Sequence, residues 1–161
     1  MRYEEFKNRI DQMAAPATPA ARCRFAVETI RLLRLRVEKE IQKELTEEER
    51  KSLSALLTGF ETESPDQLAQ TLNALVESIT RDDVRAIEFH PTITELLCAF
   101  DNWINYRRSP NPKWIANMAI DLVNVVDYEI GGNAESYSVR NILGAPEMVA
   151  ELERQKRILS P

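Results

Sequence analysis

Residues 112 to 132 read PKWIANMAIDLVNVVDYEIGG, and nearly every position in this stretch is apolar or small. Pro112 suits the first turn of a helix, and the paired glycines at 131 and 132 end one. Apolar side chains around most of the circumference indicate a helix that is covered on most sides. We therefore expect residues 112 to about 130 to form the central helix of an all-α protein.

The rest of the chain repeats its apolar residues at intervals of three or four, which is typical of amphipathic helices. No alternating run bounded by turn residues predicts a strand. The pattern predicts one all-α domain over residues 1–161, an array of seven or eight antiparallel helices. We expect helices at about residues 3–13, 19–44, 46–59, 64–79, 80–90, 92–108, 112–130 and 146–159.

Several helix ends carry capping signals. Thr18 precedes Pro19, a pair typical of a helix start. Gly59 could supply a left-handed stop for the helix before it. Capping boxes, in which two side chains each bond a backbone amide of the first turn, are predicted for Thr46 with Glu49, Ser64 with Gln67, and Thr92 with Glu95.

The overall charge is acidic, at −5 with a pI near 5.1. Nucleic-acid binding requires a basic face that displaces counterions from phosphates, so no nucleic-acid partner is expected. A basic protein partner fits this charge better. The chain also has no stretch near the roughly 18 apolar residues of a membrane span, and its acidic start does not resemble a signal peptide.

The two cysteines, Cys23 and Cys98, lie among apolar residues at helical spacing. We expect both to be buried free thiols, which favours a reducing compartment. A bridge between them stays open as an alternative.

The stretch 101–114, DNWINYRRSPNPKW, holds both tryptophans of the chain. Its prolines predict a tight corner between two helices, in which the two indoles could pack across the turn. A second interpretation is a binding hot spot, since tryptophan, tyrosine and arginine are enriched at protein interfaces. Its candidate residues are Trp103, Tyr106, Arg107 and Trp114.

A polar line also runs along the central helix. Asn117, Asp121, Asn124 and Tyr128 are spaced by four, three and four residues, so they share one narrow side. This line is either the solvent edge of a mostly buried helix or a polar strip at the floor of a groove. In the second case it would receive a basic partner, with help from two further acidic residues, Asp127 and Glu129.

Catalysis has little support in the sequence. His90 is the sole histidine and lies at a helix break, where capping is its expected role. Glu88, His90 and Glu95 do not share one helical face, so we expect no metal site. No serine stands in a glycine-flanked nucleophile turn, and the four glycines form no phosphate loop. We therefore expect no enzyme and no cofactor.

The helical pair ELLCAFDNWINYRR (95–108) and PKWIANMAIDLVNVVDYEIGG (112–132), with carboxylates near the glycine end, resembles the small acidic immunity proteins of bacterial toxin systems. The resemblance implies a cytoplasmic, non-catalytic protein that binds and neutralises a cognate toxin. Two other classes stay open. One is a ligand-binding regulator or enzyme with a pocket lined by Asp121, Asn124 and Tyr128, and the other is a homodimeric scaffold that pairs through the 19–44 helix.

Overall fold

The computed structural model describes residues 3–131 and 144–160, and these residues form nine helices and no strand. The predicted all-α class is confirmed. The described part has nine helices, one more than the eight ranges expected from the sequence. The helices are α1 (Tyr3–Ala14), α2 (Pro19–Arg36), α3 (Glu38–Glu44), α4 (Glu47–Gly59), α5 (Pro65–Thr80), α6 (Asp83–Glu88), α7 (Pro91–Arg108), α8 (Pro112–Gly131) and α9 (Pro146–Leu159).

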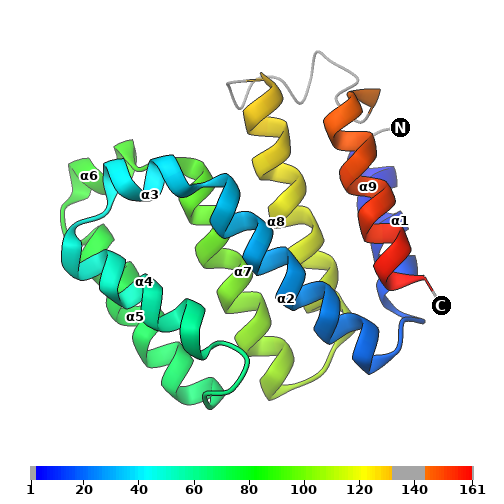
Figure 1. Cartoon of the computed structure of the whole chain (residues 1–161), viewed down its shortest axis with the longest axis horizontal. Coiled ribbons are helices and arrows are strands. Elements are labelled where there is room, and N and C mark those ends of the chain that lie inside the picture. Colours follow the sequence, from blue (N-terminus) through cyan, green and yellow to red (C-terminus); the bar gives the residue numbers. More distant parts are fainter. Residues whose placement is uncertain (1–2, 132–143, 161) are drawn as a thin grey trace.

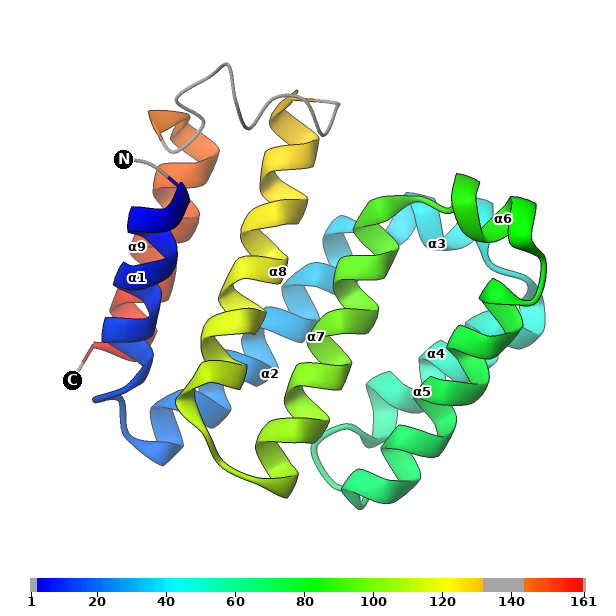
Figure 2. The same cartoon turned by 180° about the vertical axis from the view of Figure 1, so that it is seen from behind.

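The helices form a row that α2 crosses (Figure 1). The α4–α5 hairpin lies at one end of the row, α7 and α8 lie in the middle, and α1 and α9 lie at the other end. The same order is seen from behind, where α3 and α6 also lie at the α4–α5 end (Figure 2). α2 packs on α7, α8 and α9, so it ties the middle of the row to one end.

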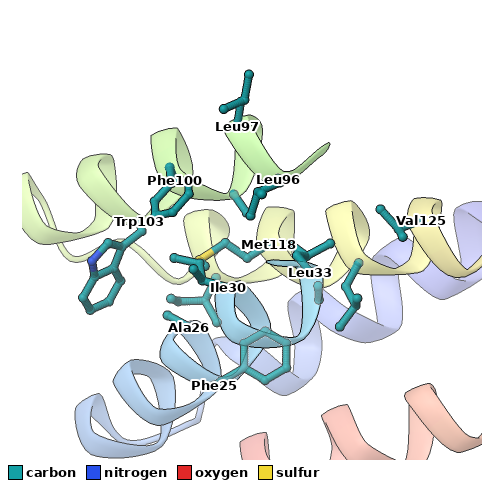
Figure 3. Close-up of a cluster of buried hydrophobic side chains, with 14 of the residues drawn as sticks. Phe25, Ala26, Ile30, Leu33, Leu96, Leu97, Phe100, Trp103, Met118 and Val125 are labelled. Atoms are coloured by element: carbon teal, nitrogen blue, oxygen red, sulfur yellow. The ribbon is translucent and has the colours of Figure 1, made fainter. Parts of the chain in front are cut away.

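The core is built around α2, α7 and α8 (Figure 3). Phe25, Ile30 and Leu33 of α2 are fully buried. Leu96 and Phe100 of α7 point towards α2, while Leu97 of the same helix points away from this cluster. Burial of one such side chain contributes about 1.5–3 kcal/mol, so the contacts between these three helices supply much of the apolar stabilisation.

The predicted central position of α8 is confirmed. This helix contacts α1, α2, α7 and α9. Its apolar residues are buried around most of its circumference, among them Ile115, Met118, Ala119, Leu122, Val125 and Val126. The remaining side of α8 carries the polar line, whose position decides what these residues can do.

Most of the predicted helix starts are confirmed. The Thr18 hydroxyl accepts a bond from the Ala21 amide at 3.1 Å. The two-way capping boxes are present at Thr46 with Glu49 and at Ser64 with Gln67.

Two capping predictions are wrong. α7 is capped by His90, whose ring nitrogen accepts from the Thr92 amide, so Thr92 and Glu95 form no capping box. Gly59 is the last residue of α4 and is followed by Phe60 in right-handed helical conformation, so it is no left-handed stop. The first error comes from matching a short motif without knowing which neighbouring group reaches the amide first.

The predicted helix over residues 19–44 is two helices, which accounts for the additional element. Val37 separates them, with φ of −97° and ψ of 13°, and its amide bonds the carbonyls of both Leu33 and Leu35. The break redirects α3 while Ile41 and Leu45 stay buried. No proline or glycine marks the position, so the local sequence gives no signal for the break.

The prediction of buried thiols is wrong, because Cys23 and Cys98 are both exposed and free. Apolar residues near each cysteine in the sequence are buried, but each cysteine lies outside the buried apolar side of its helix. None of the described helices combines the length and apolarity needed to cross a membrane.

Candidate functional site

The ten residues proposed from the sequence do not form one surface. Trp103, Tyr106, Asp121 and Asp127 are between 2% and 7% exposed, so the expectation of an exposed acidic and aromatic face is wrong for these four. The others are partly buried, apart from Glu129, which is exposed and pairs with Arg36 of α2. Nine of the ten residues divide into an aromatic corner, a polar line against α7 and the C-terminal turns of α8, and Trp114 lies apart from these groups.

The aromatic corner is a structural joint. Trp103 donates from its indole nitrogen to the Phe60 carbonyl at 2.7 Å. Arg107 donates to the same carbonyl at 3.2 Å and to the carbonyl of Glu63. Tyr106 stacks on Trp103 with ring centroids 6.0 Å apart. These bonds satisfy carbonyls at the end of α4, so the side chains of α7 fix the α4–α5 hairpin in place.

Trp114 does not join this cluster. Its half-buried ring lies under the Lys113 ammonium group, 4.3 Å from the ring centroid. Among the described residues the two indoles form no ring contact with each other, so the predicted packing across the corner is wrong. Trp103 instead packs edge-on against Phe60 at 6.5 Å.

The polar line of α8 faces α7 and forms a polar seam, which we define as Glu95, Asn102, Asn117, Asp121 and Asn124. Asn102 donates to Asp121 at 2.9 Å, and Asn117 donates to Asn102 at 3.3 Å. Asn124 donates to Glu95 at 3.1 Å. The line is therefore not a plain solvent edge, because its polar atoms bond partners on the neighbouring helix.

The two carboxyl groups of the seam, Glu95 and Asp121, both have raised pKa values. Burial, together with the negative charge of Glu95, raises the pKa of Asp121 to about 8. Burial also raises the pKa of Glu95, against the hydrogen bonds from Asn124 and Asp121. Because two close carboxylates repel each other in a medium of low polarity, the pair keeps a proton at neutral pH.

A shallow pocket of about 310 Å³ opens beside the seam. Asp121 and Asn102 form part of its wall, together with Cys98, Asp101 and Lys7. Although Cys98 is exposed as a residue, partial burial of its sulfur, with the charges of Asp121 and Glu95, raises the pKa of the thiol to about 11, so it stays protonated and is a poor nucleophile. The seam thus offers a protonated carboxyl group but no activated nucleophile.

Beyond the seam, Tyr128 meets the ring of His90 edge-on, with centroids 5.0 Å apart. His90 caps α7 and bonds Thr92 through the same nitrogen, so the capping role expected for it is confirmed. Within residues 3–131 and 144–160, no group of histidine, cysteine and carboxylate side chains could hold a metal ion.

Negative charge is concentrated elsewhere, in what we call the acidic end, residues 38–88 with helices α3 to α6. This segment carries 13 acidic and 6 basic residues, a net charge of −7, whereas the rest of the chain carries 13 acidic and 15 basic residues, a net charge of +2. Most of these carboxylates are exposed. The members that are exposed and form no ion pair with any described residue include Glu63, Glu77, Asp83 and Glu88.

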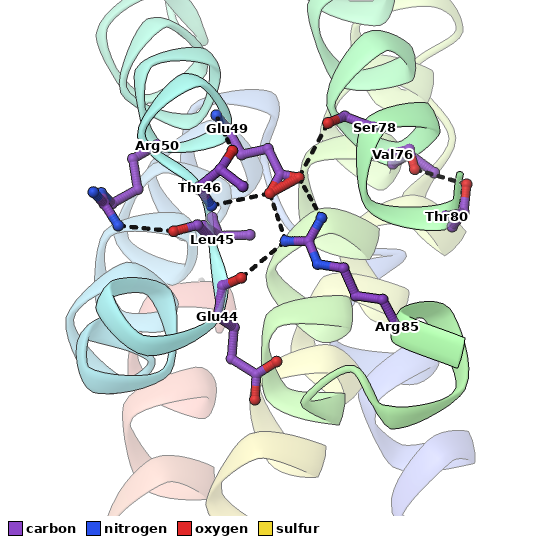
Figure 4. A network of polar contacts seen from close by, with 9 residues as sticks. All are labelled: Glu44, Leu45, Thr46, Glu49, Arg50, Val76, Ser78, Thr80 and Arg85. Atoms are coloured by element: carbon purple, nitrogen blue, oxygen red, sulfur yellow. Dashed lines mark hydrogen bonds and ion pairs between the residues drawn. The ribbon is translucent and has the colours of Figure 1, made fainter. Parts of the chain in front are cut away.

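One carboxylate of the acidic end is buried and organises its fold (Figure 4). Glu49 of α4 is 2% exposed. Its carboxylate accepts hydrogen bonds from both terminal nitrogens of Arg85 of α6, and the bond from Nη1 to Oε2 is 2.8 Å long. Arg85 also donates to the Glu44 carbonyl at 2.8 Å, and Ser78 of α5 donates to Glu49 at 3.1 Å. The pair therefore joins α4, α5 and α6 to the end of α3.

This environment shifts the Glu49 pKa downwards. Burial raises the pKa, but hydrogen bonds from Arg85, the Thr46 amide and Ser78, with the charge of Arg85, outweigh burial and lower the pKa to about 2. The Arg85 pKa rises for the reciprocal reason, chiefly its hydrogen bonds to Glu49. Both groups are charged at any moderate pH, and the contact is a permanent ion pair.

Sequence reasoning missed the acidic end as a unit and the Glu49–Arg85 pair. The segment's charge could have been counted from the sequence, whereas the pair joins residues 36 positions apart with no shared motif. Comparison of the chain with protein-family models, curated proteins and solved structures finds no match.

Proposed function

We propose that this protein is a non-catalytic binding module that engages a basic protein partner through its acidic end, in the manner of an immunity protein that neutralises a toxin. The observation that supports the proposal is the separation of charge, −7 over residues 38–88 against +2 elsewhere. A field of this kind attracts and orients a basic partner before contact, which raises the association rate by 10-fold or more at low salt.

The location of the surface differs from the one expected from the sequence. Asp121 and Asp127 are nearly inaccessible, so they cannot meet a partner without an opening of the α7–α8 pair. The carboxylates of α4 to α6 are exposed, and several lack an intramolecular ion pair among the described residues. Charges of this kind remain available to pair with arginine and lysine side chains of another molecule.

The alternative, a ligand pocket or active site at the polar seam, has less support. Ligand sites have a few polar groups that converge on an enclosed apolar cavity of about 300–1,000 Å³. The pocket beside the seam is open, and the seam residues bond one another across the α7–α8 interface. Such bonds are accounted for by the need to satisfy polar groups between two packed helices.

The proposal is tested first with the purified products of the two genes that flank this one, using surface plasmon resonance. The variant Asp83→Lys/Glu88→Lys removes charge from the acidic end. Glu147→Lys/Glu153→Lys on α9 changes the net charge equally outside it, and all four side chains are exposed.

We expect the first variant to slow association with the partner at least 10-fold at 50 mM salt, and the difference to shrink at 500 mM salt, since screening weakens surface charge interactions. The α9 variant should change the rate less than 2-fold. Equal effects of the two variants would show that net charge alone matters. Failure of both gene products to bind would reject the immunity function.

A further inference from the structure

Helix α6 presents apolar side chains to solvent. The described residues include five large hydrophobic side chains that are exposed, and two of them, Val84 at 64% and Ile87 at 86%, belong to this six-residue helix. They are three positions apart, so they lie on the same side of the helix. We call this pair the α6 face. No residue of α6 is buried, so the helix contributes little to the core.

A helix this short does not form alone, because nucleation is unfavourable and few hydrogen bonds compensate for it. α6 is held by Arg85, which reaches Glu49 and the Glu44 carbonyl. The start is fixed by Asp82, whose carboxylate accepts from the amides of Val84 and Arg85 at 3.0 and 3.2 Å. The polar network therefore fixes the α6 face in an outward orientation.

Carboxylates flank this face along the chain, with one exposed cation, Arg81, before them. Asp82 and Asp83 precede Val84, Glu88 follows Ile87, and all three carboxylates are exposed. An apolar centre with a charged rim is the usual arrangement of a protein interface, in which the centre supplies affinity and the rim supplies orientation.

Resting on the function proposed above, we propose that the α6 face is the anchor of the partner interface, and that Ile87 enters an apolar pocket of the basic partner whose rim carries arginine or lysine. A second copy of this chain is a poor occupant, because two α6 faces would bring two negative rims together. A negatively charged surface such as nucleic acid or an anionic membrane is disfavoured for the same reason.

The contact is located by placing the photo-crosslinker p-benzoylphenylalanine at position 87, or at position 35 as the control, in cells that express the full chain. Leu35 of α2 is 68% exposed and lies outside the acidic end. We expect an adduct from position 87 and none from position 35, and we expect the adduct to contain a protein of basic pI. No adduct from position 87, an acidic partner or a second copy of this chain would overturn the inference.

Calorimetry with the purified partner then measures the contribution of the face. Val84→Gln/Ile87→Gln removes the apolar groups without changing charge, and Leu35→Gln/Val149→Gln makes the same change at two exposed positions elsewhere. Full burial of one aliphatic side chain corresponds to a 10- to 100-fold change in Kd. We expect at least a 30-fold loss of affinity for the first variant and less than 3-fold for the second, with circular dichroism and Tm unchanged in both.

The two proposals fail separately. When Asp83→Lys/Glu88→Lys weakens binding but Val84→Gln/Ile87→Gln does not, the acidic end binds its partner and the α6 face is not the anchor. When the glutamine pair weakens binding but charge reversal does not, the face is the anchor of a partner that is not recognised by charge, which overturns the choice of a basic partner.

Discussion

The substitution Glu49→Gln tests how the acidic end is held together. Glutamine keeps the size of the side chain, and its oxygen can still accept from the Thr46 amide, so the capping box can persist. The change removes the negative charge that pairs with the guanidinium group of Arg85. Arg85 remains 27% exposed at its side chain, so water replaces part of what is lost.

The magnitude follows from the pKa. The folded protein lowers the Glu49 pKa from 4.5 to about 2. At 1.36 kcal/mol per unit, this shift corresponds to about 3 kcal/mol of folding free energy. Removing one member of a buried ion pair costs about 3–5 kcal/mol, and the partial exposure of Arg85 places the expected loss near the lower limit.

The sign of the pH dependence follows from a pKa that folding depresses. The stabilisation by Glu49 is fully present above about pH 4.5 and is lost as the pH falls towards about 2. The difference between wild type and Glu49→Gln should therefore shrink from about 3 kcal/mol at pH 7 to about 1 kcal/mol at pH 3.

Urea denaturation followed by circular dichroism at pH 7, 5, 4 and 3 measures this difference. The matched control is Glu48→Gln, one residue earlier in α4, where the side chain is 84% exposed and pairs with Lys51 at 3.2 Å. Its effect should stay within about 0.5 kcal/mol at every pH. A Glu49→Gln effect no larger than that of the control, or one that does not change between pH 7 and pH 3, would refute the reasoning.

Two further predictions concern the polar seam. Because burial beside Glu95 raises the pKa of Asp121 from 3.8 to about 8, its favourable contribution is fully present below about pH 4 and is lost as the pH rises towards 8. The Tm of Asp121→Asn relative to wild type should therefore increase steadily from pH 4 to pH 8 in differential scanning fluorimetry, and a constant difference would contradict the raised pKa. With a pKa near 11, against an ordinary value of 9.0, the Cys98 thiol should react with a disulfide reagent at pH 8 at least 10-fold more slowly than Cys23 when each is the sole cysteine, and equal rates would argue against the shift.

Much of the fold could be predicted because its causes are local. The central helix of residues 112–130 follows from apolar residues on nearly all its sides, and the structure has it as Pro112–Gly131. The start at Thr18 and the capping boxes at Thr46 and Ser64 depend on groups within three residues of each other. Predictions failed where no local signal marks the outcome, as at Val37, where helix direction changes.

The candidate site could be predicted only in part, because a residue's spacing says which side of a helix it occupies and not what covers that side. Asn117, Asp121 and Asn124 do share one side of α8, as their spacing indicates. Their partners on α7, Glu95 and Asn102, lie 15 to 29 positions away, and this distance hid the seam. The spacing alone predicts a solvent edge or the floor of a groove, whereas these residues bond across a helix pair, and Asn117 and Asp121 also line the open pocket beside it.

Two buried carboxylates show why acidity alone does not locate a binding surface. Glu49 and Asp121 are 2% and 7% exposed, yet folding lowers one pKa to about 2 and raises the other to about 8. The difference lies in the neighbour, which is a guanidinium group for Glu49 and a second carboxyl group, Glu95, for Asp121.

Neither carboxylate can meet a partner. The carboxylate of Glu49 is already paired with Arg85. The carboxyl group of Asp121 is largely protonated at neutral pH, because its pKa is about 8. The charge available for recognition therefore belongs to the exposed carboxylates that folding leaves unpaired among the described residues. Around α6 these carboxylates flank Ile87, which is the most exposed of the large hydrophobic side chains in the part of the chain that the structure describes. Because the same Glu49–Arg85 pair holds α6 in place, weakening the pair should lower partner affinity through the position of that helix while leaving every rim charge unchanged.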